Sequence, residues 1–180
     1  MKNLIILTIL LFSQSIAAQK YFTRTGTTHF KASVDAFEPI EAINNSSSSI
    51  LKVDTGDIAV QLFINSFQFK VALMQEHFNE NYMESERYPK AVFRGKISGF
   101  TLEKIKKQQV FPLLGTLTIR GKKKDINTTA TVFFQQNKIK LLSNFSLKPQ
   151  DFNIKIPSIV RKKIANQINV SINYELLQKN

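Results

Sequence analysis

The segment Ile168–Leu176, INVSINYEL, alternates apolar and polar side chains without interruption. Successive side chains of a β-strand point to opposite faces, so this alternation places the isoleucines, Val170, Tyr174 and Leu176 on one face. The opposite face carries asparagine, serine and glutamate. The segment is therefore predicted to be a half-buried antiparallel strand, with one face on a core and the other in water.

Further strands are predicted along the chain by the same period-two pattern, which recurs at 58–64, 113–119 and 130–134. Weaker candidates, several of them bounded by turn-prone residues, are 20–24, 27–34, 50–53, 91–100 and 138–147. Asn44–Ser49 is polar enough for a loop or a solvated strand end, and Gly121–Asp125 is typical of a hairpin connection. Eight or nine strands are expected in all.

One segment departs from the strand pattern. Apolar residues between Phe69 and Met83 recur every three to five positions, which predicts a short amphipathic helix over about Lys70–Met83. A second helical turn is predicted near Pro149–Phe152 or between Pro157 and Lys163. Many strands with one or two short helices indicate a β-barrel or sandwich with a helix covering an opening.

The N-terminus has the features of a secretory signal peptide. One lysine precedes the apolar run Leu4–Phe12, and small residues follow at Ser15, Ala17 and Ala18. A membrane anchor is the alternative, but a spanning helix needs about 20 apolar residues and this run is shorter. We therefore expect a signal peptide at 1–18 and one domain at 19–180, located in the periplasm or secreted. The chain has no cysteine, so it would use an oxidising compartment without disulfides.

The charge balance is strongly basic, with 25 Lys and Arg against 13 Asp and Glu. Nucleic acid is a common partner of such chains, but an exported protein meets anionic lipid head groups and envelope polymers instead. Basic runs at Lys104–Lys107, Lys122–Lys124 and Arg161–Lys163 interrupt apolar segments. They favour solubility and protection of strand edges, with peripheral contact to an anionic membrane surface as the alternative. No nucleic-acid partner is expected.

The residues that usually carry catalysis are scarce. The chain has no cysteine and only two histidines, His29 and His77, which excludes a cysteine nucleophile and a three-histidine metal site. His77 lies near Glu76 and Glu80, but such neighbours on a helix surface more often pair than bind a metal. A Ser-His-Asp triad stays open because its members meet only in space. Without a Gly-x-Ser-x-Gly elbow, we expect no enzyme activity, catalytic residue, metal or cofactor.

Phenylalanine is unusually frequent, at 15 residues against four tyrosines and no tryptophan. For any single phenylalanine an ordinary core position is the first interpretation. Together they exceed what a small sandwich needs, and the adjacent Phe133 and Phe134 place a ring on each face of one strand. This distribution favours a barrel whose inner wall lines a cavity.

Three motifs in order resemble the YceI-like family of exported, lipocalin-like lipid-binding proteins. The first, Leu73–Gly95 (LMQEHFNENYMESERYPKAVFRG), has the family's histidine-containing helix, acidic turn, Tyr-Pro pair and following strand. The second, Gly115–Gly121 (GTLTIRG), is similar to its hairpin entry, and the third combines Phe145 with Asp151–Ile154. The resemblance covers about Lys20–Leu177. Two stretches depart from the family pattern, at 121–124 and 156–159, and both are loops that could rim a cavity.

The resemblance implies an all-β fold: an eight-stranded antiparallel lipocalin-like barrel with one or two short helices that cap or flank it. It further implies an elongated apolar cavity for a long-chain isoprenoid or fatty acyl lipid, in lipid storage, transport or stress response, and often a homodimer. The rival hypothesis is a filled barrel that binds no lipid and contacts anionic envelope components through its basic loops. Steep salt dependence would favour the rival.

Individual residues can be assigned to the predicted cavity. Those predicted to line it are Phe67, Phe69, Phe78, Tyr82, Phe93, Leu117, Ile119 and Phe134. Those predicted to attract a phosphate or carboxylate head group at the rim are Arg94, Arg120 and Lys122.

Overall fold

The alternating segment at the C-terminal end forms β9 (Ile164–Gln178) in the computed structural model, which describes residues 19–34 and 38–179. The predicted signal peptide at 1–18 lies outside the described residues. The other long strands are β1 (Lys20–Ser33), β2 (Glu41–Lys52), β3 (Asp57–Phe63), β5 (Lys90–Ile97), β6 (Gln109–Ile119), β7 (Lys122–Gln135) and β8 (Lys138–Leu147).

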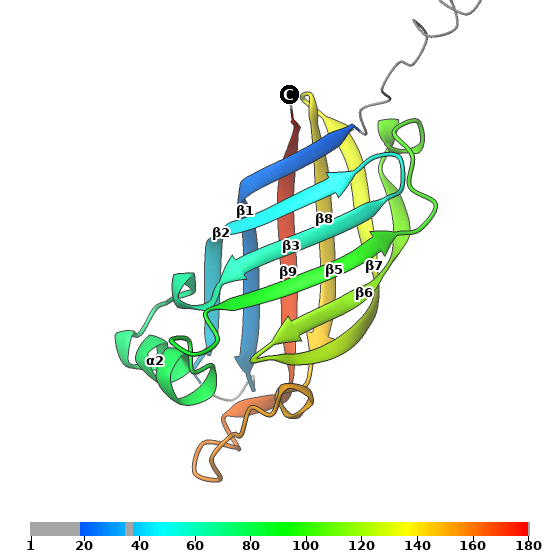
Figure 1. Cartoon of the computed structure of the whole chain (residues 1–180). Helices are drawn as coiled ribbons and strands as arrows, with labels where there is room; N and C mark the ends of the chain where they lie inside the picture. Colours follow the sequence, from blue (N-terminus) through cyan, green and yellow to red (C-terminus); the bar gives the residue numbers. More distant parts are fainter. Residues whose placement is uncertain (1–18, 35–37, 180) are drawn as a thin grey trace, which may run out of the picture.

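These eight strands close into an antiparallel barrel (Figure 1). The order is β1-β9-β8-β7-β6-β5-β3-β2, and pairing of β1 with β2 completes the ring. The two-residue strand β4 (Gln68–Phe69) adds to the edge of β2 at Ala42 and Ile43. The predicted fold class, an eight-stranded barrel with short helices, is confirmed.

Within residues 19–34 and 38–179, helical structure is confined to short segments between strands. The predicted helix over 70–83 is present as α2 (Ala72–His77), which continues as a π-helical turn, η2 (Phe78–Tyr82). Three 3-10 turns complete the set: η1 (Ile64–Ser66), η3 (Lys104–Lys106) and η4 (Pro149–Phe152). The second predicted helical turn is thus at 149–152, whereas 157–163 forms turns only. No helix within 19–34 and 38–179 has the length and apolar character to cross a membrane.

β1 and β2 bend sharply together, and this bend corrects two predictions. The β1–β2 register shifts between Thr23 and Gly26, so 20–24 and 27–34 are one bent strand rather than two. Asn44–Ser49, predicted as a loop or strand end, lies within β2. There the Asn44 side-chain oxygen accepts hydrogen bonds from the Ser46 backbone N–H and hydroxyl, at 2.9 and 3.0 Å. This local bonding allows a polar segment to continue a strand through a bulge.

Two hairpins close with two-residue turns. Arg120 and Gly121 have φ of +48° and +69°, and Gln136 and Asn137 have φ of +49° and +61°. Positive φ at both central residues is typical of the type I′ turn, whose twist matches that of the flanking strands. The predicted hairpin connection over 121–125 is therefore shorter than expected, because Lys122–Lys124 already belong to β7.

The two ends of the barrel are packed differently. The end that carries η3 and the start of β1 is filled by a continuous core that includes Leu51, Ile97, Ile105, Leu141 and Leu176, all fully buried. The other end, beside α2, has a smaller cluster around Ile64, Phe67 and Met83. The barrel interior is therefore solid at one end and available for a cavity at the other.

Candidate functional site: an apolar cavity beside the helix

An apolar cavity of about 550 Å³ occupies the α2 end of the barrel. Its inner wall comes from alternate residues of the strands, among them Val60, Leu62, Leu117 and Ile172. The mouth is bounded by α2 and η2 on one side and by the segment 153–163 on the other. A cavity of this volume lies within the range of small-molecule sites, about 300–1,000 Å³.

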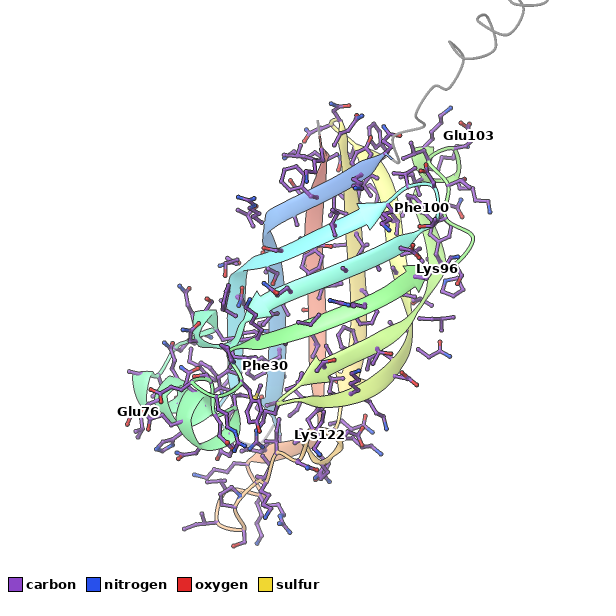
Figure 2. The ribbon with its side chains drawn as sticks, in the orientation of Figure 1. Phe30, Glu76, Lys96, Phe100, Glu103 and Lys122 are labelled. Carbon is purple, nitrogen blue, oxygen red and sulfur yellow. The ribbon has the colours of Figure 1, made fainter. Side chains whose placement is uncertain are left out.

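Four phenylalanines hold the helix against the mouth. The ring of Phe30, from β1, stacks on Phe78 of η2 with centroids 5.4 Å apart and meets Phe67 edge-on at 5.2 Å. Phe69 of β4 lies 5.1 Å from Phe78 and 5.8 Å from Phe30. All four rings also line the cavity, and Figure 2 labels Phe30 beside the helix. The cluster therefore makes the helical segment part of the cavity wall.

The position of Phe93 depends on two facing glycines. Gly95 of β5 and Gly115 of β6 pair across the strands, and a Cβ added at either would lie 2.6 Å from Cζ of Phe93. No Cβ contact that short is tolerated, so only glycine lets the ring lie against this part of the wall. The motif glycine at 115 thus shapes the cavity through the ring of Phe93.

Two polar side chains of the cavity wall, Thr28 and Tyr174, share a hydrogen-bond network with Ser47. The Thr28 hydroxyl lies 2.8 Å from the Ser47 hydroxyl and 2.8 Å from the Tyr174 hydroxyl. All three side chains are buried, and burial raises the pKa of Tyr174 above its usual value. Since buried hydroxyls need partners, this network allows polar residues of β1, β2 and β9 to face inward without disrupting the apolar site.

One side chain joins the three motifs that the sequence places far apart. Arg120, in the β6–β7 turn, donates to the carbonyl oxygen of Asn153 at 2.6 Å and forms an ion pair with Glu84. Its guanidinium also lies 5.9 Å from the ring centre of Tyr88. The side chain is only 15% exposed. Arg120 therefore fastens the loops around the mouth rather than presenting a free charge.

Seven of the eight predicted lining residues border the cavity: Phe67, Phe69, Phe78, Tyr82, Phe93, Leu117 and Ile119. The prediction for Phe134 was wrong, because this side chain is 38% exposed and lies outside the cavity. Alternation puts Phe134 on the same face as Ala130 and Val132, which are buried in the filled core. Phe134 is the next-to-last residue of β7 and pairs with Ile139, so it lies at the filled end of the barrel, away from the cavity.

The predicted head-group residues are not brought together. Arg94 is exposed on the outer face of β5, opposite in direction to Phe93, and Arg120 is occupied by Glu84 and Asn153. Lys122 is exposed at the start of β7, at the mouth end of the barrel (Figure 2). The charged residues that do border the cavity are Lys148 and Lys163, which sequence reasoning did not select.

Histidine has no metal-binding surroundings in the described part of the chain, where no group of three His, Asp or Glu residues is close enough to hold an ion. His77 borders the mouth. His29 lies 3.4 Å from Glu41, which also pairs with Lys70 at 2.8 Å. The hydrogen bond from Lys70 holds the pKa of Glu41 below its usual range. These contacts link β1 and β2 to the start of the helical segment.

The sequence matches the model of the YceI-like domain over residues 15–176. The chain belongs to the YceI-like family. The resemblance drawn from the three motifs is therefore confirmed. A search of curated proteins gave no match.

Solved structures share the fold of this YceI-like chain at low sequence identity. A polyisoprenoid-binding domain from Saccharophagus degradans, implicated in plant cell wall breakdown, aligns with a TM-score of 0.75 at 13% identity, covering 89% of this chain and 98% of that one. BcnA from Burkholderia cenocepacia aligns with a TM-score of 0.69 at 17% identity, over 86% and 96% of the two chains. A Campylobacter jejuni YceI protein gives 0.60 at 19% identity, over 80% and 87%.

Proposed function

We propose that this YceI-like barrel holds one long apolar chain, a polyisoprenoid or a fatty acyl lipid, for storage, transport or stress response. The observation that carries the proposal is a 550 Å³ cavity with apolar side chains on every wall. The similar fold of a polyisoprenoid-binding domain supports the same ligand class. The proposed partner is therefore a lipid rather than a water-soluble metabolite.

The energetics set a minimum length for the guest. Each buried methylene contributes about 0.8 kcal/mol, while association costs at least about 4 kcal/mol. Micromolar binding needs about 8 kcal/mol net, so a chain of roughly fifteen carbons or more is required. A small aromatic compound would need strong polar anchors. The hydroxyls of Thr28 and Tyr174 already bond to each other, which leaves them poor anchors.

The side chains that line the cavity favour binding over catalysis. Two hydroxyls that line the cavity, those of Thr28 and Tyr174, bond to each other and, through Thr28, to Ser47, and the Thr128 hydroxyl donates to the carbonyl oxygen of Asn144. His77 lines the mouth but its side chain is exposed, where water would compete with any proton transfer. We therefore propose a carrier, without turnover of the bound lipid.

Native mass spectrometry of protein purified without detergent, with organic extraction, tests the proposal directly. We expect a mass excess that extracts as one isoprenoid or acyl chain. Phe93→Arg places a charge in the apolar wall and should abolish retention, whereas the matched Phe134→Arg, on an exposed site, should retain the lipid. A bare mass that stays unchanged after incubation with such lipids would overturn the proposal in favour of the filled interaction barrel.

Export is a separate part of the proposal. The apolar run and small residues before position 19 support removal of residues 1–18 and a periplasmic or secreted product. The N-terminus of protein recovered from a periplasmic extract should begin at residue 18 or 19. Recovery of the full chain from the cytosol alone would contradict this part without affecting lipid binding.

A further inference from the structure

The segment 153–163 at the mouth is basic and has an apolar tip. It carries Lys155 and the run Arg161–Lys163, and it has no acidic residue. Between these charges, Ile159 is 87% exposed, more than any other large hydrophobic residue in the part of the chain that the structure describes. An exposed apolar side chain flanked by cations is the combination with which interfacial segments bind anionic lipid surfaces.

The two sides of this segment have different surroundings. Ile154, Ile156 and Val160 border the cavity, whereas Ile159 does not. Figure 1 shows the segment, in orange, projecting below the barrel at the same end as α2. The tip therefore projects from the mouth itself, and whatever binds the tip lies next to the entrance of the cavity.

The charges around the segment add to its basic character. Lys148 and Lys163 border the mouth, and the nearby carboxylate of Asp151 is paired with Lys124 at 3.3 Å. The helical side of the mouth differs, because it carries Glu76 and Glu80. An anionic partner would consequently approach the side formed by 153–163.

We propose that the protein docks on an anionic membrane surface through the segment 153–163. Ile159 enters the head-group region, and Lys155, Arg161 and Lys162 contact the lipid phosphates. The cavity mouth then opens against the bilayer, so that a lipid chain passes between membrane and barrel without crossing water. This transfer step rests on the proposed lipid-carrier function, but the docking itself does not.

Vesicle sedimentation with the mature chain measures the docking. We expect binding to phosphatidylcholine vesicles with about one-quarter phosphatidylglycerol, and little binding without the anionic lipid. Each Lys or Arg near an anionic surface strengthens binding roughly fivefold, so Lys155→Gln, Arg161→Gln and Lys162→Gln together should weaken it by about a hundredfold. Ile159→Ser should weaken it by about tenfold at unchanged charge.

A matched variant removes the same charge at the opposite end of the barrel. Lys52, Lys107 and Lys179 are exposed there, and their combined replacement by glutamine should leave vesicle binding as in the wild type. An equal loss in both triple variants would overturn the proposal, because net charge alone would then explain the attraction. Unchanged binding of Ile159→Ser would likewise overturn it, in favour of a polyanion site without insertion.

The same proteins separate docking from lipid carriage. Lys155, Arg161 and Lys162 do not line the cavity, so the mouth variant should keep its extracted lipid and its circular dichroism spectrum. Retained lipid with no vesicle binding by the wild type would refute docking and leave the carrier function intact. Vesicle binding by a wild type that never holds a lipid would refute the carrier function and leave docking intact.

Discussion

The guanidinium of Arg120 pairs with the carboxylate of Glu84 and thereby joins the β6–β7 turn to the turn that follows the helix. The same guanidinium donates to the carbonyl oxygen of Asn153. Arg120, Glu84 and Asn153 all have positive φ, at 48°, 47° and 56°. Left-handed backbone is unfavourable for residues with a Cβ, so these contacts help to hold three tight turns around the mouth.

Arg120→Lys should lower the free energy of unfolding by about 2 kcal/mol. A lysine ammonium has no planar fork and cannot reproduce both the contact with Glu84 and that with Asn153. Urea denaturation followed by circular dichroism measures the change. The control Arg94→Lys, exposed on the outer face of β5, should change stability by less than about 0.5 kcal/mol. Equal effects of the two replacements would show that the junction does not stabilise the fold.

Gly115→Ala should destabilise the barrel by about 2 kcal/mol or more. The new Cβ would lie 2.4 Å from the carbonyl oxygen of Arg94 and 2.6 Å from Cζ of Phe93, so both the strand and the ring must move. Leu114→Ala, on the exposed outer face next to it, should lose less than about 1 kcal/mol. Chemical denaturation compares the two, and similar midpoints would mean that the strands adjust freely at Gly115.

Tyr174→Phe should cost about 1 kcal/mol at neutral pH, because it removes a buried hydrogen bond to Thr28. The raised pKa of Tyr174 also predicts pH dependence. The folded protein keeps the phenolic proton to higher pH than the unfolded chain does. Stability is therefore fully present below about pH 10, the ordinary tyrosine pKa, and is lost as pH rises beyond it.

Above about pH 10, the stability of Tyr174→Phe should fall less steeply with pH than that of the wild type. Part of the alkaline loss should remain, because burial also raises the pKa of Tyr82. Thermal melts between neutral and alkaline pH measure the slope. Parallel slopes for Tyr174→Phe and the wild type would assign the alkaline loss to other groups.

Ala91→Phe should reduce lipid retention without adding charge. Ala91 faces the cavity, and a phenyl ring there would fill space that the guest needs. Ala59, on the outer face of β3 opposite Arg94, provides the matched replacement Ala59→Phe, which should retain lipid like the wild type. Extracted lipid per protein is the measurement. Equal retention in both variants would place the guest away from β5.

The sequence predicted the parts of the fold that depend on periodicity. Ile168–Leu176 forms a strand because its inward residues are apolar in strict alternation. The burial of Asn44 and Ser47 was not predicted by this alternation. Both are fully buried, and each is hydrogen-bonded to a residue distant in sequence, Asn44 to Phe63 and Ser47 to Thr28. A hydropathy pattern does not reveal hydrogen bonds between residues that are distant in sequence.

In the candidate site, too, local patterns predicted some residues and missed others. Phe93, predicted as a wall residue from an aromatic ring within a strand, borders the cavity. Phe134 is on the inward face of its strand but lies too far along the barrel to reach the cavity, because alternation fixes the direction of a side chain and not its position along the barrel axis. Lys148 and Lys163 border the mouth only because loops return to it, and a loop path is not encoded in a local pattern.

The filled end of the barrel, with Leu51, Ile97 and Leu141 fully buried, affects how one guest replaces another. A blind pocket has one entrance, so an incoming chain cannot displace a resident one from behind. The bound lipid must leave before another can enter, and the end of its chain nearest the mouth emerges first. The rate of lipid exchange should therefore equal the dissociation rate of the bound lipid and be independent of the concentration of the competing lipid. Which lipid the protein carries would then depend on how long each one stays bound rather than on how much of it is present.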